Sequence, residues 1–209
     1  MKRLLAFLVL IVIAVGVWFT ISNEEAVSAE ETLYTEAELQ PYENFYASLA
    51  QHCGNAYEGR LTTAPPGDDM ITFEDVLVVH FRECGDSVLK APFHIQTVAD
   101  GDWNRSRTWI FTKHSDGLEL RHDHRKPDGS DDEVTMYGGL QYGVNEDGMQ
   151  IFQSIPRTEE TGIFRGWRIE IEPGVRYTYG TIGGDEWRWR IDFDLTKPIE
   201  LPPAPWGHE

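Results

Sequence analysis

Short runs in which apolar and polar residues alternate dominate the sequence, and this two-residue period is typical of β-strands with one buried face. The clearest run is 187–195, and the same alternation recurs over 77–81, 89–95 and 167–171. Turn sequences rich in Pro, Gly and Asp separate the runs, and no helical stretch between them is long enough to connect parallel strands. The pattern therefore predicts about eight to ten antiparallel strands that cover a core on one side.

These strands are expected to form one domain over 36–196. Closing an antiparallel sheet removes its exposed edges, so we predict an up-and-down β-barrel of lipocalin-like architecture, with a two-sheet sandwich or jelly roll as the alternative. Strand parity places Trp167, Trp187 and Trp189 on the inner face. There they either fill the core or line a ligand cavity.

One segment at the start of this domain has the 3.6-residue period of a helix instead. Apolar side chains recur at three- and four-residue spacings between Leu39 and Leu49, which predicts an N-terminal amphipathic helix over 36–52 that ends before Gly54. Pro41 either lies in the first turn of this helix or makes it begin later.

The first 29 residues have the pattern of a signal peptide or a membrane anchor. Leu4–Ile21 carries no charge and follows Lys2 and Arg3. As a helix it would be about 27 Å long, which is close to the thickness of a bilayer core. The small residues at 27–29 also form a cleavage site for a signal peptidase, so a cleaved signal and a retained anchor both fit. Either one places the rest of the chain on the exported side of the membrane.

Three further features complete this organisation. Residues 30–35 read as an acidic spacer, and 197–209 as a Pro-rich, extended C-terminal tail. Cys53 and Cys84 are the only cysteines and have no metal-finger spacing. In the oxidising compartment that the leader indicates, we expect them to form a disulfide, the alternative being two buried thiols.

Composition narrows the classes of partner. The chain has 209 residues with 18 Lys+Arg, 35 Asp+Glu and a formal net charge of −17. Residues 1–29 are neutral overall, so the whole net charge belongs to the exported part. Nucleic acid is excluded because its phosphates require a basic face, and anionic membrane surfaces are unsuitable for the same reason. Membrane contact is therefore expected only through the N-terminal segment.

One strand rich in histidine stands out. His122 and His124 share parity with Leu118 and Leu120, so their imidazoles should lie side by side on the inner face or at the mouth of the barrel. An H-x-H pair of this kind begins several β-structured sites for divalent metal ions, which a third ligand would complete. No third ligand is identified by spacing. The alternative is a polar patch in which the histidines bond to Tyr137 or a buried carboxylate.

Basic residues are also concentrated nearby. Arg105, Arg107 and Trp109 form a basic patch in the string NRSRTW, and the guanidinium groups suit a carboxylate or phosphate at the barrel mouth. The alternative is that they pair with the surplus of acidic side chains.

Several strings in this region resemble a family of uncharacterised bacterial secreted or envelope proteins. The most specific is the HDHR-x2-DGS motif at 122–130. The others are RECG at 82–85, PFH at 92–94, RSRTW at 105–109 and YGG at 137–139. The family has no assigned activity, so the resemblance supplies no catalytic residues. It implies export and suggests that the strings belong to one site or scaffold.

We therefore expect an exported cell-envelope β-barrel that binds a small ligand through Arg105, Arg107, His122 and His124. A metal-dependent enzyme, in which His122 and His124 hold a divalent ion, is the second hypothesis. A structural envelope protein that makes contacts through its Pro-rich tail is the third.

Overall fold

The computed structural model describes residues 40–67, 71–97, 101–143 and 146–209. The predicted leader, the spacer and the first residues of the predicted helix lie outside these ranges. Within them, no helix is long and apolar enough to cross a membrane.

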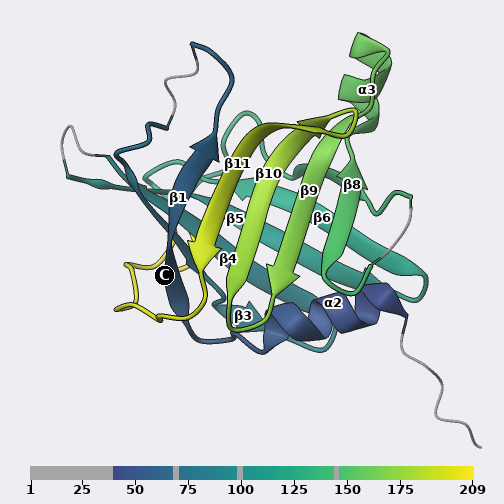
Figure 1. The fold of residues 1–209 in the computed structure, drawn as a ribbon. Coiled ribbons are helices and arrows are strands. Elements are labelled where there is room, and N and C mark those ends of the chain that lie inside the picture. The colour runs from purple at the N-terminus through teal and green to yellow at the C-terminus, as the bar shows by residue number, and fades with distance from the viewer. Residues whose placement is uncertain (1–39, 68–70, 98–100, 144–145) are drawn as a thin grey trace, which may run out of the picture. The chain divides into compact units, whose positions relative to one another are not determined.

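The described chain forms two helices and a single sheet (Figure 1). The helices are α2 (Pro41–Ala50) and α3 (Ile155–Thr161). The strands of the first half are β1 (Ala56–Thr63), β2 (Val76–His80), β3 (Glu83–Cys84), β4 (Val88–Gln96), β5 (Trp103–His114) and β6 (Gly117–His124). The strands of the second half are β7 (Tyr137–Leu140), β8 (Met149–Gln153), β9 (Arg165–Glu172), β10 (Arg176–Gly183) and β11 (Glu186–Asp194).

Almost every strand pairs with its neighbours in sequence, and all the pairs are antiparallel. The sheet runs in the order β7-β6-β5-β4-β2-β1-β11-β10-β9-β8, and β3 pairs with β4 outside this path. The two ends of the order then meet, because Gln141 bridges Phe152 and the backbone N–H of Tyr142 donates to the carbonyl of Ile151 at 2.8 Å. This nearly closed meander confirms the predicted up-and-down β-barrel.

Two consecutive glycines let the barrel close between β7 and β8. A Cβ atom on Gly139 would lie 1.8 Å from the carbonyl oxygen of Gln153, and one on Gly138 would lie 1.8 Å from that of Leu120. Any side chain here would therefore collide with backbone on a neighbouring strand, which explains why this short strand reads Tyr-Gly-Gly.

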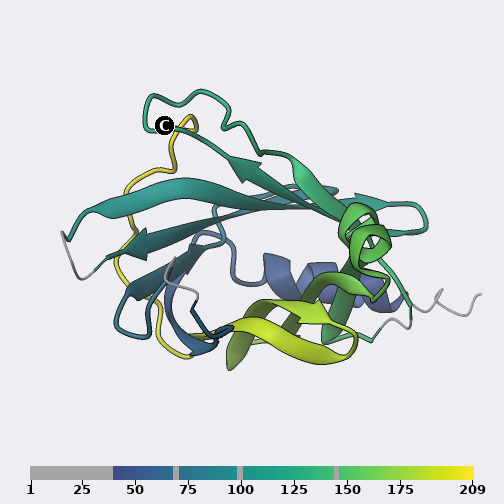
Figure 2. The ribbon, with the colours of Figure 1, turned by 90° about the horizontal axis from the view of Figure 1, so that it is seen from above.

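The helix α2 closes one end of the barrel. Pro41 occupies its first position, where a missing N–H costs nothing, and Glu43 accepts a hydrogen bond from the backbone N–H of Gln40 at 2.9 Å. Seen from above, α2 lies between the two halves of the sheet (Figure 2). Its apolar face is buried there through Tyr42, Phe45, Tyr46 and Leu49.

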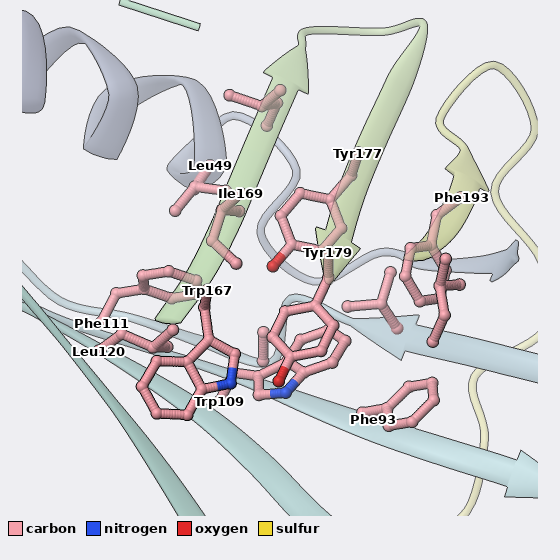
Figure 3. Packing of buried hydrophobic residues seen from close by; sticks show 14 of the residues in the cluster. Leu49, Phe93, Trp109, Phe111, Leu120, Trp167, Ile169, Tyr177, Tyr179 and Phe193 are labelled. Atoms are coloured by element: carbon pink, nitrogen blue, oxygen red, sulfur yellow. The ribbon is translucent and has the colours of Figure 1, made fainter. Parts of the chain in front are cut away.

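Aromatic side chains fill the middle of the barrel. Trp109 stacks on Tyr179 with ring centroids 4.0 Å apart and on Phe93 at 4.9 Å. Figure 3 shows the rings of Trp109 and Tyr179 close to Trp167, which comes from a different strand, while Leu49 of α2 meets Ile169 on the helix side of these rings. The core is therefore packed between the helix and this aromatic layer.

The predicted inward position of Trp187 is wrong, whereas Trp167 and Trp189 are buried as expected. Thr181 pairs with Trp189 but Ile182 pairs with Trp187, so β11 contains one more residue than β10 at this point. Such a bulge turns the next side chain to the other face. Trp187 therefore lies outside, between the guanidinium groups of Arg168 and Arg190 at 5.2 and 5.3 Å from its ring.

The predicted disulfide is confirmed. Cys53, just after α2, is bonded to Cys84 in β3, with Cα atoms 6.1 Å apart. The bond ties the helix that closes the barrel to the first half of the sheet.

Replacing Cys53 and Cys84 together by alanine should lower the free energy of unfolding by about 3–4 kcal/mol on the chain-entropy model, because the unfolded chain regains the freedom of a loop whose ends are 31 residues apart. Urea unfolding followed by Trp fluorescence measures this change. Wild-type protein treated with a reductant should unfold at the same lowered midpoint as the variant. If both midpoints equal that of the oxidised protein, the bond does not stabilise the fold.

Candidate functional site

The α3 end of the barrel contains a cavity of about 330 Å³. Arg157 of α3 and Pro65, just after β1, are among the residues that line it. In Figure 1, α3 lies at the opposite end of the sheet from α2. The lining of the cavity combines aromatic rings with basic and hydroxyl groups, from Pro65, Ile71, Phe93, Arg107, Trp109, His122, His124, Tyr137, Arg157, Trp167, Tyr179, Thr181, Arg188 and Trp189.

His122 lies at the back of this cavity and uses both ring nitrogens within the protein. Its Nδ1 lies 3.2 Å from the carbonyl oxygen of Tyr137, and its Nε2 lies 2.7 Å from the hydroxyl of Tyr179. Since a carbonyl can only accept, Nδ1 carries the proton and Nε2 accepts from the Tyr179 hydroxyl. The ring is 2% exposed and stacks on Tyr137 at 4.7 Å. It is therefore held in one tautomer and one orientation.

His124 lies nearer the mouth and is only half-buried. Its Nε2 lies 3.1 Å from the hydroxyl of Tyr137, so this tyrosine is hydrogen-bonded to both histidines, to His122 through its backbone carbonyl and to His124 through its side chain. The structure thus forms the hydrogen-bonded patch with Tyr137 that the sequence left open as an alternative to a metal site.

The donor set does not fit a metal ion bound by both histidines. A metal ligand needs a free lone pair on an imidazole nitrogen, and both nitrogens of His122 are already hydrogen-bonded. Among the described residues, no three His, Cys, Asp or Glu side chains gather in a way that could hold a metal ion.

Burial and positive charge control protonation in the cavity. Burial, the larger cause, lowers the pKa of His122 to about 3, and the charges of His124, Arg157 and Arg107 add to this effect. The pKa of His124 is also lowered, first by burial and then by Arg107. Burial raises the pKa of Tyr137 despite these arginines. All three groups are therefore neutral at pH 7, and the arginines carry the charge of the cavity.

Of the two arginines expected at the mouth, the structure places only Arg107 in the cavity. Phe93 pairs with Arg107 but Ile95 pairs with Asn104, so β5 has one more residue than β4 between these points. This bulge sends Arg105 to the outer face, where its guanidinium bonds to the carbonyl of Ala204 in the C-terminal tail. The expectation that both arginines serve one site is corrected by this bulge.

Two arginines that the sequence did not single out line the cavity instead. Arg157 comes from α3, a helix of seven residues that no strand alternation could reveal. Arg188 has the parity of outward residues in β11, but the bulge that moves Trp187 outward lets Arg188 line the cavity. In the sequence, the Gly-rich segment 180–184 before the Trp-Arg-Trp-Arg run at 187–190 is the feature that could have indicated a bulge in this hairpin.

The outward side chains of the HDHR motif hold the tail on the outer face of the barrel. Asp123 is 1% exposed and accepts from Arg125 and from His208, with Nε2 of His208 at 2.8 Å. Gly207 has a φ of +76° and packs against Gly129 so closely that a Cβ would lie 2.7 Å from its carbonyl oxygen. The motif thus serves two faces of one strand, since His122 and His124 line the cavity and Asp123 binds His208 of the tail on the outside. Figure 2 shows the C-terminus beside the loop that follows β6.

Lowering the pH from 6.5 toward 3 should reduce the free energy of unfolding, in part through His122. In the unfolded chain a histidine has a pKa near 6.5, whereas folding lowers that of His122 to about 3. Between these values the unfolded state binds a proton that the folded state excludes, so the loss reaches at most about 1.4 kcal/mol per pH unit for this group. Urea unfolding at a series of pH values measures the slope.

His122→Gln removes this titrating group, so between pH 6.5 and 3 the difference in bound protons between the unfolded and folded states should fall by close to one, and the slope should become correspondingly less steep. A long-range ¹H–¹⁵N NMR spectrum of the wild type provides the direct check, because Nδ1 should carry the proton at pH 7 and at pH 5. Tyr179→Phe should shift the Nε2 resonance of His122, while the bond from Nδ1 to the carbonyl of Tyr137 keeps the ring in the same tautomer. A doubly protonated ring at pH 5 would contradict the assignment.

Comparisons with protein-family models, with curated protein sequences and with solved structures find no match for this chain. Its function is therefore argued from the cavity itself.

Proposed function

We propose that the protein binds a small organic anion with an aromatic or apolar body in the cavity at the α3 end of the barrel. One observation carries this proposal: Arg157 and Arg188 line a cavity with aromatic walls and form no ion pair among the described residues, in a chain with a net charge of −17.

The contrast with the other basic residues gives this observation its weight. In the described chain, more than half of the Lys and Arg side chains pair with a carboxylate within 4.0 Å. Carboxylates are abundant enough to pair with Arg157 and Arg188 as well, yet the described lining of the cavity contains no Asp or Glu. Guanidinium groups suit carboxylates and phosphates, so an anionic ligand group would provide the missing partner.

The aromatic walls of the cavity indicate the kind of group to which the anionic group of the ligand is attached. Trp109, Trp167 and Trp189 are nearly fully buried, and each presents part of an indole to the cavity. Aromatic faces favour flat or apolar groups. The volume of about 330 Å³ is at the lower end of the range for small-molecule sites, so the ligand is small.

The two other hypotheses receive less support. The metal-dependent enzyme needs a lone pair that His122 uses for Tyr179. The structural envelope protein needs its tail for contacts with partners, yet Trp206 and His208 of the tail bind the barrel of the same chain. A location on the exported side of the membrane remains part of our proposal, and the disulfide supports it.

Anilinonaphthalene sulfonate and N-phenylnaphthylamine test the proposal, because they have the same ring system with and without an anionic group. The protein should enhance the fluorescence of the sulfonate and bind it roughly tenfold more tightly than the neutral probe, which lacks the guanidinium contacts. The double variant Arg157→Gln/Arg188→Gln should lose most of this preference while retaining binding of the neutral probe.

The double variant Arg60→Gln/Arg176→Gln is the matched control. It changes the net charge equally, but both arginines lie on the outer face, with side chains 79% and 46% exposed. It should retain the preference for the sulfonate. If the two double variants behave alike, the charge of the cavity does not select the ligand; if neither probe binds to the wild type, the proposal fails.

A further inference from the structure

A second, smaller pocket adjoins the cavity, between α3 and the hairpin of β10 and β11. Its volume is about 210 Å³. It shares Arg157, Trp167, Thr181 and Arg188 with the main cavity, so the two hollows lie next to each other. The remaining lining residues are Ser154, Glu160, Thr161, Arg165, Gly166 and Ile182.

Backbone contacts fix the position of α3 at this pocket. The N–H of Ser154 donates to the carbonyl of Arg165 at 2.8 Å, and the N–H of Arg165 donates to the hydroxyl of Thr158 at 3.0 Å. The helix is thus tied to the first residue of β9. This arrangement brings Arg157 of α3 and Arg165 of β9 to the same pocket.

Arg165 and Arg188 lie close together over a glycine. A Cβ on Gly183 would lie 2.2 Å from Nη1 of Arg165 and 3.0 Å from Cδ of Arg188. Because Gly183 has no side chain, both arginines can cover it. Neither of them, nor Arg157, forms an ion pair among the described residues. Three guanidinium groups therefore line one pocket without a bonded counter-charge among the described residues, and an anion bound there would supply one.

One carboxylate also lines the pocket. Glu160 of α3 is exposed and makes no ion pair with the three arginines at 4.0 Å or less. Three positive groups and one negative group leave the lining with a charge of +2. A monocarboxylate or a sulfonate would neutralise half of this charge. A phosphate monoester, which carries a charge of about −1.5 to −2 at pH 7, would match it.

We propose that the ligand is an aromatic phosphate monoester whose phosphate occupies this side pocket among Arg157, Arg165 and Arg188. This assignment rests on the proposed function and names the class of its ligand. A phosphate has three terminal oxygens, so each guanidinium can donate to a different one, whereas a carboxylate has only two oxygens to share. The ring extends past Trp167 into the main cavity, where the walls are aromatic.

Calorimetric titrations with naphthyl phosphate, naphthoate and inorganic phosphate test the assignment on the full chain. The first two share a ring and differ in the anionic group, and the third lacks the ring. Naphthyl phosphate should bind roughly tenfold or more tightly than either of the others, because only it uses both hollows. Arg165→Gln should remove most of the difference between naphthyl phosphate and naphthoate, since Arg165 lines only the side pocket.

The outcomes separate the two proposals. Equal affinities for naphthyl phosphate and naphthoate would overturn the phosphate assignment and leave the organic-anion proposal standing. Equal affinities for naphthyl phosphate and inorganic phosphate would overturn the role of the ring. If neither aromatic ligand binds, both proposals fail.

Two further variants test whether a loss of affinity in Arg165→Gln has a cause other than the lost contact with phosphate. Arg165→Lys keeps the charge but loses the planar fork, and it should retain part of the preference for phosphate. Arg60→Gln, on the outer face, should leave all three affinities unchanged. Circular dichroism and the thermal midpoint of each variant establish that it is folded. A folded Arg165→Gln that keeps the full preference would overturn the assignment.

Discussion

Closure of the sheet between β7 and β8 is the contact on which the rest of the structure depends. It rests on one bridge, Gln141 to Phe152, and on the close approach of Gly139 to the backbone of Gln153. An open sheet of this curvature would expose two strand edges and could not enclose a hollow. With the seam closed, every strand of the main path has two neighbours, and an inward side chain faces the inward side chains of the opposite wall.

A small closed barrel is normally filled by its own side chains. Here the position of α2 determines which end of the barrel is packed and which end contains the cavity. The helix inserts Phe45 and Leu49 at one end, and the stack of Trp109 on Tyr179 covers the top of that core. Above the stack the inward positions hold His122 and other long polar side chains, which pack less completely than aliphatic ones and favour a hydrated or ligand-filled space. The cavity is thus a consequence of the difference between the two helices, because α2 buries an apolar face in its end of the barrel whereas α3 buries no residue at the other.

The alternation of the sequence predicted the barrel, the helix and the inward histidines, but it could not predict which arginines reach the cavity. Strand parity holds only while both strands advance by equal numbers of residues, and one extra residue reverses every later side chain. Bulges in β5 and β11 break parity in this way. They separate Arg105 from Arg107, move Trp187 outward and bring Arg188 to the cavity. Nothing in the local composition fixes where such a residue is inserted, because the choice depends on cross-strand packing.

The distribution of charge constrains what the cavity can bind. An outer surface that carries the net charge of −17 repels anions at distances up to the Debye length, about 8 Å at physiological ionic strength. Arg157 and Arg188 line the cavity beside its aromatic walls, and water and salt screen their charges beyond a Debye length, so their attraction for an anion exceeds the repulsion only at short range. A simple inorganic anion experiences mainly the repulsion during its approach and gains nothing from the indole rings. An anion with an apolar body gains contact energy as well, and the combination of repulsive surface and attractive interior therefore favours amphipathic over simple anions.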